Sequence, residues 1–92
     1  MKFEHVAGKG ITKITLYALS TCIWCKKTKD FLLSQGVAFD YIYVDLLKGE
    51  ERSMAIEKIK QCNPSISFPT IIIGEKCIVG YKEKEIKEAL EI

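Results

Sequence analysis

The sequence predicts an α/β protein with a four-stranded mixed β-sheet flanked by three helices, in the order β-α-β-α-β-β-α. Three observations predict this fold class. The chain has 92 residues, of which 48% are hydrophobic, which is enough for one domain with its own core. Short runs of β-branched and aromatic residues alternate with longer stretches of helical periodicity. The last two of these runs are separated only by Gly74-Glu75, a hairpin signal.

The amino-terminal part of the chain predicts a strand followed by a helix. Residues 1–10 show no clear periodicity and are expected to form a loose lead-in to the single domain of residues 1–92. Residues 11–19 are rich in β-branched and aromatic side chains, which indicates a strand. A helix is expected over residues 23–35, and Gly36 is suited to end it. Its apolar stripe consists of Trp24, Thr28, Phe31 and Leu32.

The rest of the chain predicts three strands and two helices. Residues 39–44 have apolar side chains at both odd and even positions, as expected for a strand covered on both faces. The first strand, the helix and this strand then make a parallel pair through a right-handed crossover. A second helix is expected over residues 50–62. The hairpin of residues 70–73 and 76–79 adds an antiparallel pair, and an amphipathic helix over residues 82–91 completes the fold.

Composition and the amino-terminal segment argue against several classes of protein. Lys and Arg number 14 and Asp and Glu 12, so the net charge is only +2, and no basic block stands alone. A nucleic-acid partner is therefore not expected. The first residues lack the apolar core of a signal peptide, and every apolar run is far shorter than a membrane span. We expect a cytoplasmic protein that is monomeric and has no membrane partner.

Four cysteines are unusual in so short a chain, and Cys22 and Cys25 lie three positions apart. Cys22 falls at the amino terminus of the predicted helix, where free N–H groups and the positive end of the helix dipole stabilise a thiolate. Cys25 follows one turn later on the same face. This spacing predicts a two-step cycle in which Cys22 attacks a substrate disulfide and Cys25 resolves the mixed disulfide.

Other chemistry at the cysteines and the histidine is less favoured. A C-x-x-C pair is half of a zinc site, but a zinc ribbon needs two such pairs and this chain has one. Cys62 lies on the inward stripe of the second helix and Cys77 in a strand, so both are expected to be small buried apolar residues. His5 lies in the lead-in, and nothing aims it at Cys22 to form a hydrolase pair. We therefore expect a surface histidine.

Four blocks of sequence resemble the glutaredoxins of the thioredoxin superfamily. They occur in the family's order and spacing over nearly the whole chain after residue 10: Ile14-Thr15-Leu16-Tyr17, Cys22-x-x-Cys25, Ser67-Phe68-Pro69-Thr70 and Gly80-Tyr81. The resemblance implies a thioredoxin-like fold and an enzyme that exchanges thiols and disulfides in electron transport and cell redox homeostasis. Its nucleophile would be Cys22 and its resolving thiol Cys25, with no tightly bound cofactor.

The block around Pro69 acquires a function only through the resemblance. Statistics of X–Pro bonds alone favour a trans bond before Pro69. The resemblance implies a cis bond and a proline that lies against the active-site cysteines. It also implies that Phe68, next to Ser67, offers its backbone N–H and C=O to an extended substrate that contains a cysteine, in the manner of an added strand.

Aromatic residues are expected to border the site. Trp24 has two interpretations, because it opens the apolar stripe of the helix and also stands between the two cysteines. We expect it to be partly exposed beside Cys22 and to contribute to substrate docking. The resemblance implies that Gly80 and Tyr81 also contribute to substrate binding.

Departures from the family pattern bear on the electron donor. Glutaredoxins usually carry Pro-Tyr between the cysteines, and a lysine three residues before the first cysteine that pairs with a carboxylate of glutathione. This chain has Ile23-Trp24 and Leu19 there. An aromatic residue after Gly80 is similar instead to the redoxins fed by thioredoxin reductase, which supply ribonucleotide reductase. The donor is thus a glutathione-like thiol or a flavoprotein of the thioredoxin-reductase type, and poor turnover with glutathione is expected.

Two alternatives stay open at this point. Lys82 or Lys84 would be able to bind the carboxylate or sulfonate of a small thiol, although exposed helix lysines are usually only solvated. Some members of the family hold an iron–sulfur cluster between two protomers, each contributing the cysteine that corresponds to Cys22. A cluster carrier is therefore the alternative to an oxidoreductase that acts on protein or small-molecule disulfides.

Overall fold

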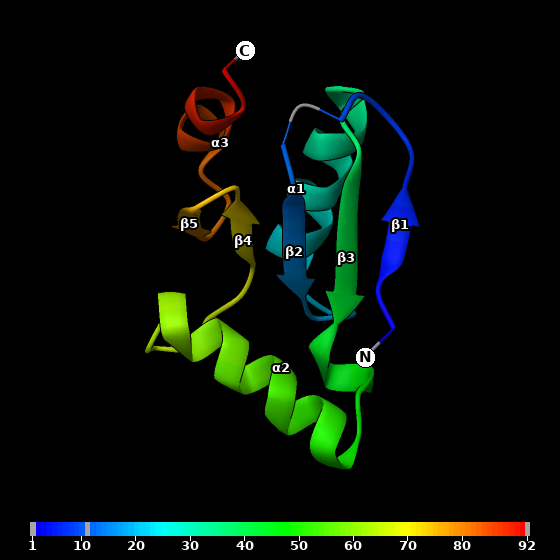
Figure 1. The fold of residues 1–92 in the computed structure, drawn as a ribbon, viewed down its shortest axis with the longest axis vertical. Coiled ribbons are helices and arrows are strands. Elements are labelled where there is room, and N and C mark those ends of the chain that lie inside the picture. Colours follow the sequence, from blue (N-terminus) through cyan, green and yellow to red (C-terminus); the bar gives the residue numbers. More distant parts are fainter. Residues whose placement is uncertain (1, 11, 92) are drawn as a thin grey trace.

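The sheet is built around a parallel pair of strands, β2 (Ile14–Ala18) and β3 (Phe39–Tyr43), which α1 (Ile23–Ser34) connects. In the computed structural model, which describes residues 2–10 and 12–91, β4 (Thr70–Ile73) pairs antiparallel with β2. The neighbouring strand β5 (Lys76–Val79) pairs antiparallel with β4. Figure 1 shows this arrangement, in which the carboxyl end of β2 leads directly into α1.

The lead-in carries a strand, so the predictions of a loose segment and of a four-stranded sheet were wrong. β1 (Glu4–Val6) pairs antiparallel with β3, and the described residues form a five-stranded sheet of order β1-β3-β2-β4-β5 (Figure 1). The sequence could not reveal β1, because it is three residues long and largely exposed, with no apolar alternation. Its continuation needs Gly8, where a Cβ atom would lie 2.6 Å from the carbonyl carbon of Val37.

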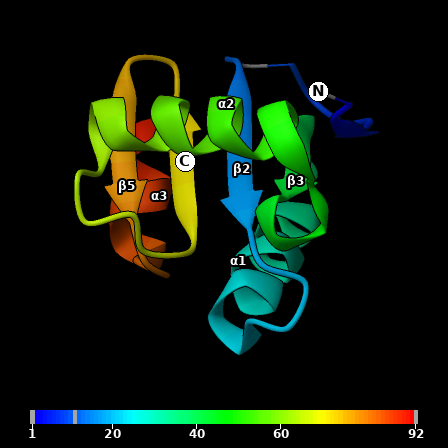
Figure 2. The same ribbon diagram turned by 90° about the horizontal axis from the view of Figure 1, so that it is seen from below.

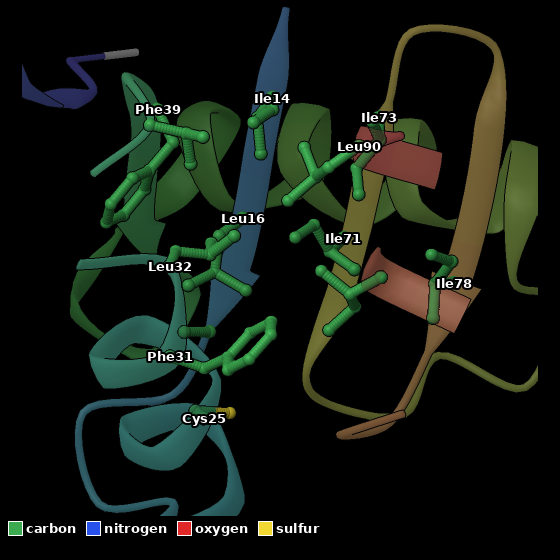
Figure 3. Packing of buried hydrophobic residues seen from close by; sticks show 13 residues of the cluster. Ile14, Leu16, Cys25, Phe31, Leu32, Phe39, Ile71, Ile73, Ile78 and Leu90 are labelled. Carbon is green, nitrogen blue, oxygen red and sulfur yellow. The ribbon is translucent and has the colours of Figure 1, made fainter. Parts of the chain in front are cut away.

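Helices cover both faces of the sheet. α1 and α3 (Glu83–Leu90) lie on one face, and α2 (Gly49–Cys62) crosses the other (Figure 2). Figure 3 shows the larger core cluster, which includes Ile14, Leu16, Phe31, Leu32, Phe39, Ile71, Ile73, Ile78 and Leu90. The smaller cluster under α2 consists of Tyr17, Ile42, Val44, Ala55 and Ile59. Because both faces of the sheet are buried, the central strands have apolar side chains at both odd and even positions.

The predicted elements other than the lead-in are confirmed, with shifts at their ends. The two hairpin strands have the predicted bounds, and α1 ends one residue earlier, before Gly36, which adopts a left-handed φ of 69°. A turn of 3-10 helix, η1 (Val44–Leu46), follows β3. Met1, Ile92 and Ile11, the last being the start of the predicted first strand, lie outside the described residues. No helix in the described ranges has the length and apolarity to span a bilayer.

Cys62 and Cys77 form a disulfide, so the prediction that they are buried core residues was wrong. Both are half-buried, and their Cα atoms lie 5.9 Å apart, within the usual range for a disulfide. Cys62 ends α2. Cys77 lies opposite Ile72, a residue that packs under α2, so both share that face of the sheet. Only this tertiary arrangement brings the two sulfurs together.

Candidate active site

Cys22 occupies the amino-terminal cap of α1. Its backbone is extended, with φ −91° and ψ 117°, and its Sγ accepts a hydrogen bond of 3.2 Å from the backbone N–H of Cys25. The thiol is half-buried and therefore accessible to a substrate. The sulfur lies at the amino terminus of α1, where free backbone N–H groups and the positive end of the helix dipole stabilise negative charge that develops during a reaction. The cap position thus makes Cys22 suited to nucleophilic attack.

Cys25 lies one turn behind Cys22 and is buried, with 2% of its surface exposed. Figure 3 places it at the edge of the core cluster, below Phe31. Burial, together with the hydrogen bond to Cys22, raises the pKa of the Cys25 thiol to about 12. This thiol therefore keeps its proton at neutral pH, and the two cysteines differ in accessibility.

We expect the reduced protein to lose stability as the pH rises above about 9, where a cysteine of the unfolded chain ionises and the folded Cys25 does not. With its folded pKa near 12, Cys25 retains a proton that the unfolded chain has lost, so the free energy of unfolding falls with pH in this window. Urea unfolding of the reduced protein at about pH 8 and about pH 10 measures the slope. Cys25→Ser removes the ionising group and should flatten it. If the free energy of unfolding changed equally with pH in both proteins, the raised pKa of Cys25 would be contradicted.

The turn before Cys22 is held by Asp45, a residue of η1 that was not among the predicted site residues. The backbone N–H of Ser20 donates to Asp45 Oδ1 at 2.9 Å, and the Ser20 hydroxyl donates to Oδ2. This hydroxyl hydrogen bond lowers the pKa of the Asp45 carboxyl. A signal was available, because Asp45 follows the end of β3 and the carboxyl ends of parallel strands meet at one edge of a sheet.

A pocket of about 170 Å³ opens beside Cys22. It is lined by Leu19, Ser20, Cys22, Lys26, Lys29, Asp30 and Tyr43. Leu19, where the resemblance leads one to expect a lysine, forms an apolar part of this lining. The two lysines of the pocket come from α1 instead, and Lys29 Nζ also lies 4.1 Å from the centroid of the Tyr41 ring. The positive charge beside Cys22 is therefore arranged differently from that of the family pattern.

Aromatic side chains form a second, open pocket of about 310 Å³. It is lined by Trp24, Phe68, Gly80, Tyr81 and Lys82, which we call the aromatic rim. The Trp24 and Tyr81 rings stack, with centroids 6.2 Å apart and planes inclined by 28°. Trp24 is 53% exposed, which confirms the expected partial exposure. Cys22, Phe68 and Tyr81 all pack against the larger core cluster. Trp24 follows Cys22 by two residues on α1, so it connects the rim to the helix that Cys22 caps.

The peptide bond between Phe68 and Pro69 is cis, as the resemblance implies. The Pro69 carbonyl accepts a hydrogen bond of 2.8 Å from the Gly80 N–H, which joins this segment to the end of β5. Within the described part of the chain, the backbone N–H and C=O of Phe68 have no backbone partner. They are available to an incoming extended chain.

Asn63 holds the segment that leads to the cis proline. This buried residue caps the end of α2, and its Nδ2 donates to the Ser67 carbonyl at 3.2 Å, the Ser67 hydroxyl at 3.1 Å and Thr70 Oγ1 at 3.2 Å. Ser67 is thus engaged with Asn63 and does not line the aromatic rim. Asn63 was not among the predicted site residues. Its position directly before Pro64, at the end of a helix, was the available signal.

The other titratable candidates lie apart from this site. His5 is exposed on β1 and bonds Asp40 through Nδ1 at 2.6 Å, which confirms the expected surface histidine. No group of three or more His, Cys, Asp or Glu side chains in the described ranges is placed to hold a metal ion.

Comparison with known proteins agrees with this geometry. Residues 14–78 match the family model of the glutaredoxins. The chain superposes on the crystal structure of the glutaredoxin from Methanosarcina mazei Go1 with a TM-score of 0.93 and 53% identity, covering 100% of this chain and 90% of that one. For Methanosarcina acetivorans methanoredoxin the TM-score is 0.89 and the identity 55%, over 92% and 90% of the two chains. An uncharacterised glutaredoxin-like 8.6 kDa protein from Clostridium pasteurianum is 34% identical over 79 residues, which are 85% of this chain and 97% of that protein.

Proposed function

The chain belongs to the glutaredoxin family, and from this premise we propose that it reduces disulfides of proteins or small molecules by thiol–disulfide exchange through Cys22 and Cys25. One observation carries the proposal. An accessible thiol caps α1, and a buried thiol lies one turn behind it, with its backbone N–H bonded to the first sulfur. This pairing separates a nucleophile from a resolving group.

The first step is attack of the Cys22 thiolate on one sulfur of a substrate disulfide. The Cys22 sulfur forms a new S–S bond with that sulfur, and the substrate S–S bond breaks. The second substrate sulfur leaves as a thiolate and takes a proton from solvent. The Cys25 N–H and the amino terminus of α1 stabilise the attacking anion before the step begins. The product is a mixed disulfide between Cys22 and the substrate.

In the second step, Cys25 loses its proton and attacks the Cys22 sulfur. The bond between Cys22 and the substrate breaks, and the substrate sulfur that Cys22 attacked leaves as a thiolate and takes a proton from solvent. A Cys22–Cys25 disulfide remains, so two electrons have passed to the substrate. The charge on Cys22 contributes to the raised pKa of Cys25. Because the mixed disulfide removes this charge, the Cys25 thiol becomes easier to ionise at the point in the cycle where its thiolate is needed.

Substrate docking is proposed for the aromatic rim. The unpaired backbone groups of Phe68 suit an extended segment that adds as a short strand and brings its cysteine to Cys22. The exposed face of Trp24 and the stacked ring of Tyr81 provide apolar contact on one side of that segment. This arrangement selects for accessible, extended disulfide-containing substrates.

For the electron donor we propose a flavoprotein of the thioredoxin-reductase type in preference to glutathione. Leu19 cannot form the ion pair that a lysine at this position makes with a carboxylate of glutathione. Tyr81 after Gly80 gives the rim an aromatic wall, in the manner of the redoxins fed by such reductases. No tightly bound cofactor is needed, because the two sulfurs hold both electrons.

A coupled turnover assay tests the function and its donor together. We expect reduction of a model disulfide with NADPH and thioredoxin reductase to be faster than with glutathione and glutathione reductase. Leu19→Lys should raise the glutathione rate about fivefold, which is the effect of one exposed ion pair near 1 kcal/mol, and should leave the reductase-driven rate unchanged. Faster turnover with glutathione in the unmodified protein would contradict the donor proposal. No turnover with any thiol or reductase would contradict the function.

A further inference from the structure

The disulfide between Cys62 and Cys77 joins the two chain segments that frame the aromatic rim. We propose that it is a second redox site, and that its reduction loosens the rim around Phe68 and Tyr81 and weakens substrate binding. The proposal rests on the oxidoreductase function proposed above and adds regulation of substrate binding to it. The regulating disulfide is separate from the Cys22–Cys25 pair that carries the electrons.

The covalent ring closed by this disulfide contains the substrate segment. Residues 62–77 form the ring, and Phe68 and Pro69 lie within it. Its first part leaves the end of α2, which Figure 2 shows on the β5 side of the molecule. Beyond the ring, β5 continues for two residues and reaches Gly80, whose N–H bonds the Pro69 carbonyl at 2.8 Å. The two segments are thus tied by the disulfide and again at the rim.

A residue in an unfavourable conformation lies inside this ring. Ile66 has a φ of 51°, in the left-handed region that β-branched residues rarely adopt. Such a conformation persists only where contacts with the surrounding structure hold the backbone in it. Here the Ile66 N–H donates to the Asn63 carbonyl at 2.9 Å, and the side chain packs against the cluster under α2. The disulfide fixes Cys62, the residue before Asn63, so reduction releases one constraint on the segment that carries Ile66.

The disulfide is open to reagents that can reduce it. Cys62 and Cys77 are both half-buried, whereas Cys25 is buried in the core. A dithiol, either a small molecule or a reduced C-x-x-C protein, would attack one sulfur and then close on itself. The dithiol loses two electrons and two protons and becomes a disulfide, and Cys62 and Cys77 become two thiols. A disulfide oxidant reverses the step with the same balance.

Hydrogen exchange tests the mechanical half of the proposal without any activity readout. In Cys22→Ser/Cys25→Ser, the remaining two of the four cysteines are Cys62 and Cys77, so mass spectrometry after alkylation counts their thiols at each dithiothreitol concentration. On reduction we expect amide exchange over residues 63–69 and 80–82 to accelerate about fivefold or more, the effect of freeing about one ordered residue, and α1 to stay unchanged. Unchanged exchange in the reduced protein, or reduction only when the whole protein unfolds, would make the disulfide a structural crosslink and overturn the proposal.

Kinetics test the functional half. With the reductase as donor, Cys62→Ser/Cys77→Ser should raise the KM for a disulfide-containing peptide about fivefold over the protein with the disulfide intact, with kcat changed less than about twofold. An unchanged KM together with an inactive Cys22→Ser protein would overturn the second redox site and leave the proposed function standing. Full activity in Cys22→Ser would overturn the proposed function itself.

Discussion

Replacing Cys22 with serine should lower the turnover of disulfide substrates by at least about 10³-fold, the scale seen when a nucleophile is removed. A serine hydroxyl at the cap of α1 stays protonated near neutral pH and cannot attack sulfur. Cys25 cannot replace the lost nucleophile, because it is 2% exposed and burial, which persists in this variant, raises the pKa of its thiol. The helix terminus thus activates Cys22, and burial keeps Cys25 protonated.

The measurement is NADPH consumption with thioredoxin reductase and a model disulfide. Met54→Ser is a matched control, because Met54 is exposed on α2, outside both pockets of the candidate site. It should keep the activity of the unmodified protein. The folded state of each variant is checked by thermal unfolding. Turnover of Cys22→Ser within about tenfold of the unmodified protein would show that another group performs the attack.

Replacing Cys25 with serine should have the opposite effect on the intermediate, which accumulates instead of failing to form. Cys22 keeps its cap position and its accessible sulfur, and the backbone N–H that donates to this sulfur remains in place. Attack on a protein disulfide therefore proceeds and gives the mixed disulfide. Resolution fails, because a serine hydroxyl cannot displace the bound thiol. We expect close to one trapped substrate per protein molecule when no other thiol is present.

Non-reducing electrophoresis and intact mass spectrometry detect this adduct. The mass should increase by that of the substrate and return to its starting value after treatment with dithiothreitol. Cys22→Ser/Cys25→Ser is the matched control and should form no adduct at this site. A trapped substrate in the control, or complete release by Cys25→Ser without added thiol, would contradict the assignment of the two roles.

Local sequence signals were sufficient for much of the active site. The C-x-x-C pair directly before an apolar helical stripe placed the proposed nucleophile at a helix terminus, and the structure has Cys22 at that cap. The hairpin bounds followed from Gly74 between two β-branched runs. The cis bond before Pro69 needed the family resemblance, because residue statistics alone favour trans.

By itself, the sequence determined the central β-α-β unit, the hairpin, the covering helices and the position of the two redox cysteines. These features arise from neighbours within one or two turns of the chain, where periodicity, capping and turn chemistry act. The tertiary structure decided four others: the β1 edge strand, the Cys62–Cys77 disulfide, and the anchoring roles of Asp45 and Asn63, whose chain positions gave only a weak local signal. The same physical reason explains why the sequence did not predict these four features. Each depends on which backbone or side-chain groups come into contact once the chain has folded, and such contacts leave no periodic pattern in the sequence.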